Sequence, residues 1–369
     1  MAMEAPISTL IYVNLKFSPR LVYLEKNQII AICVAAVIIG SVGLVVIWNL
    51  PPSEPTTTIR IGYLSKDLHQ LALQVALENG LFDRENITVE LVQYGNGALE
   101  MDGFLAGQID MGYLGAAPAI LKRINQDIMI TILAAVNMEG STIMVLKSEY
   151  EAGHVTSVAD LAGKGVFHPG PATVQNLLLR LALNQSGLSY DNITATTMSP
   201  TYMADSLTPA TPAFIAWEPF NAKAEYENKS VPLITSGEIW PDHPCCVLAA
   251  DNIYLSTNPD IVQKIVNIHI EATEWIVNNP TQAIAIATDW LEMDITPVTT
   301  AFNNIIYNWN LNRTGLEMYL DFLIDEEQLI PEKIPADPSA FLDDLINTTY
   351  TGSFFFAVEK RQTEKQVQS

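Results

Sequence analysis

The sequence predicts an α/β protein with two lobes, preceded by one membrane-spanning helix. Three observations support this prediction. From residue 58 onward, short apolar runs typical of buried strands alternate with amphipathic helical patterns. That alternation is interrupted by two polar, irregular patches, at 148–154 and 235–244, which suggests two blocks joined by two crossings. Residues 29–48 form twenty consecutive uncharged positions, about the length of a bilayer-spanning helix.

The uncharged run at 29–48 predicts an uncleaved membrane anchor. Lys16, Arg20 and Lys26 precede it, and no base follows before Arg60, so the N-terminus should be cytoplasmic. A cleaved signal peptide is the alternative, but the run is longer than a usual signal core and no A-x-A site follows it. We therefore expect a cytoplasmic segment at 1–28, a Pro/Thr linker at 49–58, and a single-pass cell-membrane protein whose C-terminal domain is extracytoplasmic.

The first block alternates strands with helices. We expect strands at 58–64, 87–94, 109–115, 128–136 and 142–147, and helices at 67–79 and 98–107. Pro118 suits the first turn of a further helix, where its missing N–H costs nothing. Such alternation is typical of parallel or mixed sheets covered by helices on both faces.

The second block repeats the pattern, and a helical region follows it. Strands are expected at 164–168, 192–198 and 212–217, helices at 171–185 and 219–228, and a strand begins at Cys245. From Pro259 the chain reads as helices to residue 346. We therefore expect lobe I at 59–147 plus 245–350, lobe II at 148–244, and a flexible tail at 351–369.

The charge of the chain excludes some partners. Nineteen Lys and Arg residues face 41 Asp and Glu residues, for a formal net charge of -22. A surface this acidic repels nucleic acid and anionic lipid headgroups, so we expect neither as a partner. We also expect the protein to be a monomer.

No motif for catalysis, cofactor binding or metal binding stands out. The P-loop, zinc-protease, nucleophile-elbow and Cys/His zinc spacings are missing, and we predict no cofactor. His243 beside Cys245 and Cys246 is a candidate metal set, but a buried strand start explains these residues more simply. The two cysteines are no disulfide framework, and a strained vicinal disulfide between them stays open as an alternative to free thiols.

Several loops that follow a strand and precede a helix carry only small side chains. The clearest are Gly115-Ala116-Ala117 and Gly170-Pro171-Ala172-Thr173. A helix N-terminus offers unpaired N–H groups and a partial positive charge, and small residues let a ligand approach that backbone closely. Tight strand–helix packing would explain either loop alone, but together they predict an anion site at the carboxyl ends of the strands.

A series of segments resembles a known family along residues 59–350. They are GYLSKDLHQLALQVALENGLF, LAGQIDMGYLGAAPAI, VADLAGKGVFHPGPATVQNLLLRLAL, FIAWEPFNAKAE and NPDIVQKIVNIHIEATEWI. In this order they resemble the extracytoplasmic solute-binding proteins of nitrate/sulfonate/taurine ABC importers (NitT/TauT, SsuA/NMT1-like). The resemblance implies a bilobal type II periplasmic-binding-protein fold, a ligand in the interlobe cleft, and an ABC permease with its ATPase as partners.

The resemblance also implies which residues contact the ligand. They are Ser65, His69, Gly115, Ala116, Ala117, Glu139, Ser141, Gly170, Ala172, Thr173, Trp217 and Glu218. The two prolines in MADSLTPATPAFIAWEP depart from the family's usual helix and turn, so the wall of the second lobe is expected to differ.

The expected function is capture of a small anion without catalysis. Nitrate, bicarbonate and sulfonates are handled by relatives; the alternative is an enzyme on the same fold, similar to pyrimidine-precursor synthases or menaquinone-pathway enzymes. Glu218 directs the choice of ligand, because a carboxylate at the cleft would suit the ammonium group of a taurine-like sulfonate. Capping of the helix that starts near Pro219 is the other interpretation of Glu218.

Overall fold

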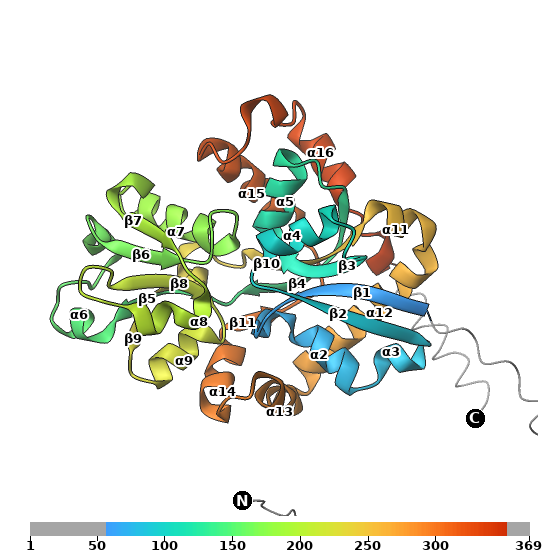
Figure 1. Cartoon of the computed structure of the whole chain (residues 1–369), viewed down its shortest axis with the longest axis horizontal. Helices are drawn as coiled ribbons and strands as arrows, with labels where there is room; N and C mark the ends of the chain where they lie inside the picture. The colour runs from blue at the N-terminus through green and yellow to red at the C-terminus, as the bar shows by residue number, and fades with distance from the viewer. Residues whose placement is uncertain (1–56, 353–369) are drawn as a thin grey trace, which may run out of the picture. The chain divides into compact units, whose positions relative to one another are not determined.

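The computed structural model describes residues 57–352, which contain two separate β-sheets (Figure 1). The first sheet has six strands in the order β11-β4-β10-β3-β1-β2, and the second has five in the order β7-β6-β8-β5-β9. We call the first sheet with its helices lobe I and the second sheet with its helices lobe II. The fold is therefore the α/β two-sheet arrangement expected from the sequence.

Lobe I has a parallel half and an antiparallel half. In the parallel half β1 lies between β2 and β3, while β10 runs antiparallel to both β3 and β4. All five residues of β3 are buried, as expected for a strand covered on both faces. The strands of this sheet are β1 (Thr57–Leu64), β2 (Ile87–Tyr94), β3 (Met111–Gly115), β4 (Ile130–Glu139), β10 (Pro244–Asp251) and β11 (Ile305–Tyr307).

Lobe II is also mixed. The strand β6 pairs in parallel with β7 and β8, whereas β5 is antiparallel to β8 and β9. Its strands are β5 (Ser141–Leu146), β6 (Gly165–His168), β7 (Thr194–Thr197), β8 (Ala213–Trp217) and β9 (Ser230–Thr235). One cluster of buried apolar side chains includes residues of both sheets, so the two lobes share a continuous core.

Helices cover the faces of both sheets (Figure 1). The longest, α12, carries its buried residues on one stripe against β4 and β11, and Pro259 occupies its first turn. The α-helices are α2 (Leu71–Glu78), α3 (Leu81–Arg84), α4 (Gly97–Leu105), α5 (Ala116–Asn125), α6 (Lys147–Glu151), α7 (Val174–Gln185), α8 (Pro200–Met203), α9 (Phe220–Tyr226), α10 (Ser236–Ile239), α11 (Asn252–Thr257), α12 (Pro259–Asn278), α13 (Pro280–Leu291), α14 (Ile295–Asn303), α15 (Arg313–Asp325) and α16 (Pro338–Leu345).

The first crossing between the lobes differs from the sequence prediction. The strand β5 was assigned to lobe I, with the crossing at 148–154, but it pairs with β8 and β9 in the second sheet. The chain therefore leaves lobe I at Gly140, between β4 and β5, and 148–154 belongs to lobe II. An apolar run predicts a buried strand but not the strands with which it pairs. The chain returns to lobe I between β9 and β10, by way of α10.

Several predicted segments fall wholly or mostly outside the part of the chain that the structure describes. The expected cytoplasmic segment at 1–28, the anchor at 29–48 and most of the linker at 49–58 precede residue 57, and most of the expected tail at 351–369 follows residue 352. Within residues 57–352, none of the helices combines the length and apolar character needed to cross a bilayer.

Candidate functional site

A small cavity lies between the two lobes. Its volume is about 280 Å³. It is lined by Leu64, Asp67, His69, Gly97, Gly115, Pro118, Cys245 and Cys246 of lobe I and by Thr173, Val174, Gln175 and Trp217 of lobe II.

Three helices begin at the wall of this cavity. The N-caps of α4, α5 and α7 are Asn96, Gly115 and Thr173. The side chain of Thr173 accepts a hydrogen bond from the N–H of Asn176, whereas Gly115 has no side chain with which to cap α5. Helix N-termini from both lobes thus direct N–H groups and partial positive charge to one place, which suits an anion.

Small residues let the lobes come together at this point. A Cβ atom on Gly115 would lie 3.0 Å from Cγ2 of Val174 in the opposite lobe, and one on Gly97 would lie 2.9 Å from Cγ of Pro118. The glycines in these loops therefore leave room both for the opposite lobe and for the cavity itself.

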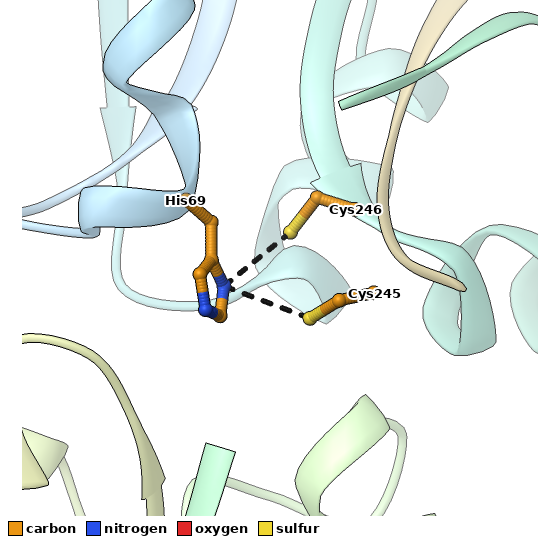
Figure 2. Close-up of side chains that lie close together, drawn as sticks. All are labelled: His69, Cys245 and Cys246. Atoms are coloured by element: carbon orange, nitrogen blue, oxygen red, sulfur yellow. Dashed lines mark hydrogen bonds between the residues drawn. The ribbon is translucent and has the colours of Figure 1, made fainter. Parts of the chain in front are cut away.

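His69, Cys245 and Cys246 form a compact group on the lobe I side of the cavity (Figure 2). The Nδ1 atom of His69 lies 3.6 Å from Sγ of Cys245 and 3.9 Å from Sγ of Cys246. Its Nε2 atom lies 3.0 Å from the carbonyl oxygen of Gly140, to which it donates a hydrogen bond. Both thiols are free, so the structure does not contain the vicinal disulfide left open by the sequence.

The charges in this group are tightly linked. Burial raises the pKa of Asp67 to about 7, and its Oδ1 lies 3.3 Å from Nδ1 of His69. Burial alone would lower the pKa of His69, but Cys245 and Asp67 outweigh it and raise that pKa to about 9. A hydrogen bond with Cys246 lowers the pKa of the Cys245 thiol well below its usual range, while the same contact and burial raise the pKa of Cys246. Negative charge therefore concentrates on Cys245, facing an imidazole.

His243, the histidine that the sequence placed nearest the cysteines, is not part of this group. Its Nδ1 atom lies 3.1 Å from the carbonyl oxygen of Pro244, where β10 begins, and the side chain is fully buried. The strand-start interpretation of this segment is therefore confirmed, and the histidine that joins the cysteines comes from the segment after β1.

Glu218 serves the protein rather than a ligand in this structure. Its Oε2 atom accepts a hydrogen bond from the N–H of Ala222 in α9 at 3.0 Å, and Oε1 accepts one from Nδ2 of Asn304 in lobe I at 2.7 Å. The side chain is fully buried, and burial raises its pKa despite these two hydrogen bonds. The capping interpretation describes these contacts, and the amide of Asn304 takes the place proposed for an ammonium group.

The predicted contact residues divide by their position relative to the cavity. His69, Gly115, Thr173 and Trp217 line it, while Ala117 and Ala172 line a neighbouring hollow between α5 and α7. The remaining predicted residues lie outside its lining: Ser65, Ala116, Glu139, Ser141, Gly170 and Glu218.

Two of these outlying residues hold other parts of the protein in place. Glu139 accepts a hydrogen bond from the N–H of Asp242 at 2.9 Å, which ties the outgoing chain to the returning one. Ser141 accepts a hydrogen bond from Nε2 of Gln175 at 3.0 Å and orients that lining side chain.

Sequence reasoning missed several lining residues. Asp67 is one of them. Cys245 and Cys246 are a candidate metal set with His243 in the sequence, but no local spacing connects the two cysteines with His69. The sequence does contain a signal for Gly97 as a lining residue. Gly95-Asn96-Gly97 follows a strand and precedes a helix, as the two predicted loops with small side chains do. The place of the cysteines at this cavity follows only from the pairing of β10 with β3, which sets Cys246 opposite Gly115.

A second, larger cavity lies away from these helix N-termini, beside α8, α9 and the turn between α13 and α14. Its empty volume is about 770 Å³. Two of its three lysines are already paired, since Lys223 and Lys229 contact Glu227 at 2.8 and 2.7 Å. The smaller cavity is the one at which helix N-termini from both lobes converge.

Known proteins share this fold and parts of this sequence. A Brucella abortus (strain 2308) protein is 25% identical over 285 residues, which cover 76% of this chain and 83% of the relative. The periplasmic nitrate-binding protein NrtA from Synechocystis PCC 6803 superposes with a TM-score of 0.74 at 16% identity, covering 83% of this chain and 90% of NrtA. The alkanesulfonate-binding protein SsuA from Xanthomonas axonopodis pv. citri, solved with bound MOPS, has a TM-score of 0.67 at 17% identity, covering 78% of this chain and 99% of SsuA.

The resemblance that the sequence motifs indicated is thereby confirmed at the level of fold and family. The model of the NMT1-like family matches residues 52–291, and the protein belongs to the NMT1-like family.

Proposed function

We propose that this protein is the substrate-binding protein of an ABC importer, that it is anchored through residues 29–48, and that it captures a small oxyanion between its lobes. The observation that carries the proposal is the convergence of the N-termini of α4, α5 and α7, from both lobes, on one cavity. Two structural neighbours, NrtA and SsuA, bind nitrate and alkanesulfonates.

The ligand proposed is a bare anion headgroup rather than a zwitterion. Taurine was favoured because Glu218 could bind its ammonium group, but the oxygens of that carboxylate already accept hydrogen bonds from Ala222 and Asn304. None of the lining residues is a lysine or arginine, so recognition falls to backbone N–H groups and to the side-chain amide of Gln175. Nitrate, bicarbonate and the headgroup of a short alkanesulfonate remain as candidates, because each is a small oxyanion that backbone N–H groups at helix N-termini can bind.

Titration calorimetry with the full chain in detergent tests this proposal. Nitrate, bicarbonate, methanesulfonate and taurine are compared, and chloride is the control for charge alone. We expect saturable one-to-one binding of at least one oxyanion and no gain from the amino group of taurine. If none of the oxyanions binds more tightly than chloride, the proposal is wrong.

The partner proposal is tested separately. We expect the neighbouring genes to encode an ABC permease and its ATPase, and co-expression with them should give a complex that survives affinity purification. A permease that purifies without this protein, with or without the bound anion, would contradict the importer assignment.

A further inference from the structure

Three soft metal-ligand atoms meet at the lobe I side of the cavity. Nδ1 of His69 and the two Sγ atoms of Cys245 and Cys246 all lie within 4.8 Å of one another. With typical Zn–N and Zn–S bond lengths and tetrahedral angles, the ligand nitrogen and each sulfur would be separated by about 3.6 Å. The observed N···S distances are 3.6 and 3.9 Å, so the three donors already stand close to a coordinating arrangement.

The orientation of His69 is set by the crossing segment. Because Nε2 donates to the carbonyl oxygen of Gly140, the ring presents Nδ1 to the sulfurs (Figure 2). A carbonyl that accepts from the second ring nitrogen is the usual outer partner of a metal-bound histidine. Gly140 has a φ of 83°, and a Cβ atom there would lie 2.3 Å from Nε2, so the close approach of this backbone requires glycine.

The surroundings favour a cation at this point. His69 and Cys245 are each 1% exposed and Cys246 is 3% exposed, and the buried carboxylate of Asp67 lies beside the ring. None of the lining residues is a lysine or arginine, so His69 is the only lining side chain that can carry positive charge beside the two sulfurs and Asp67. A zinc ion bound here would supply the positive charge that two buried thiolates need once Nδ1 of His69 is a metal ligand.

We propose that His69, Cys245 and Cys246 bind a zinc ion, with the fourth coordination position open to the interlobe cavity. Three protein ligands and one open position are typical of a zinc site that binds an exogenous group, whereas structural zinc sites have four protein ligands. On binding, two S–Zn bonds and one N–Zn bond form, and any protons on the sulfurs and on Nδ1 leave to solvent. A captured oxyanion could then supply the fourth ligand; this last step rests on the proposed function, but the metal site does not.

Cobalt(II) is the probe, because it replaces zinc in such sites and absorbs visible light. The full chain is purified with a non-thiol reductant, stripped with a chelator and titrated with cobalt under nitrogen. We expect one cobalt per chain, a thiolate-to-cobalt charge-transfer band in the near ultraviolet, d–d bands typical of tetrahedral cobalt, and displacement of all of these by zinc.

Substitutions connect the signal to the three residues. His69→Gln and Cys245→Ser should each weaken cobalt binding by about 100-fold or more, since even the loss of an outer partner costs 10- to 100-fold. His154→Gln is the matched control, because its imidazole is 61% exposed, outside the cavity, and would contribute only adventitious binding. Circular dichroism verifies that each variant is folded, and Cys246→Ser replaces Cys245→Ser if the latter is not.

Two results would overturn the proposal. One is a reduced, folded protein without a charge-transfer band, which would leave an imidazolium–thiolate pair as the resting state. The other is a band that persists unchanged in His69→Gln and in the folded cysteine variant. Both are measured without an anion, so a failure here is distinct from a failure of anion binding by calorimetry.

Discussion

The contacts of Glu218 distinguish between the two roles that the sequence allows for it, ligand binding and helix capping. Its two oxygens accept hydrogen bonds from Ala222 and Asn304, in different lobes. Because α9 follows directly, the carboxylate stabilises the start of that helix and connects it to the end of α14. Its role is therefore to join the lobes.

The substitution Glu218→Gln tests this role. We expect the ratio of taurine to methanesulfonate affinity to stay the same, because the carboxylate contacts protein donors. We also expect a loss of about 1–3 kcal/mol in the free energy of unfolding, since the new amide N–H₂ must face another donor. Calorimetry measures the ratio and urea unfolding the stability; a selective loss of taurine affinity would restore the ammonium hypothesis.

His269 should make stability depend on pH. It is fully buried in α12, donates from Nε2 to the carbonyl oxygen of Ala135 at 2.8 Å, and burial lowers its pKa to about 4. In the unfolded chain its pKa is about 6.5, so the unfolded state takes up a proton first as the pH falls. Stability should therefore fall between pH 6.5 and pH 4, by about 3 kcal/mol from this group.

The control for this prediction is His269→Gln, which cannot titrate. Urea unfolding of the variant at pH 7 and pH 4.5 should show a smaller loss of stability than the wild type shows. The same loss in both proteins would mean that other groups cause the pH dependence.

At the scale of elements, the junction between β3 and α5 decides how closely the lobes approach. The strand ends and the helix begins without a side chain between them, and Val174 at the start of α7 lies opposite. Two helix N-termini from different lobes can meet across a small ligand only if nothing projects from this junction.

Gly115→Ala tests this element. The new methyl group would lie 3.0 Å from Val174 and 3.1 Å from Pro118, so the closed arrangement becomes overpacked by about 1–3 kcal/mol. Since the contact with Val174 crosses between lobes, we expect at least a tenfold loss of anion affinity with little loss of stability. Gly95→Ala is the control, because its methyl group would have only an ordinary contact at 3.6 Å with Leu99. Equal affinities in the two variants would contradict this role of Gly115.

At the scale of the whole described molecule, contacts across the cleft favour closure. Glu326, which follows α15 in lobe I, accepts hydrogen bonds from Arg180 at 2.9 Å and from Asn184 at 2.7 Å, both in α7 of lobe II. Asn96 also donates to the carbonyl oxygen of Pro169 across the same gap at 3.2 Å. We expect the two crossing segments, at Gly140 and at α10, to act as the hinge, because hinges are commonly short connecting segments that absorb backbone rotation.

Glu326→Gln should shift the balance between open and closed forms. Loss of the partly buried pair with Arg180 weakens closure by about 1 kcal/mol, or roughly fivefold in anion affinity. Small-angle scattering should show compaction with anion in the wild type and incomplete compaction in the variant. Glu332→Gln, an exposed acid nearby, is the control. A radius of gyration that anion leaves unchanged in the wild type would contradict hinged closure.

Much of the architecture follows from local pattern. Strand–helix alternation and the small-residue junction at Gly115 can both be predicted from the sequence, because each depends on residues a few positions apart. The same is true of the family resemblance, which depends on short motifs in a constant order. The expected anchor at 29–48 also comes from local pattern and stays a prediction.

What only the tertiary structure decided is which distant residues meet. The apolar run at 141–146 could have paired in either sheet, and its partners β8 and β9 place it in lobe II. His243 is two residues from Cys245 in sequence, yet the imidazole that faces the cysteines is His69, 176 residues away. Sheet pairing and lobe closure are sums of many weak long-range contacts, so no window of the sequence contains the information that brings these side chains together.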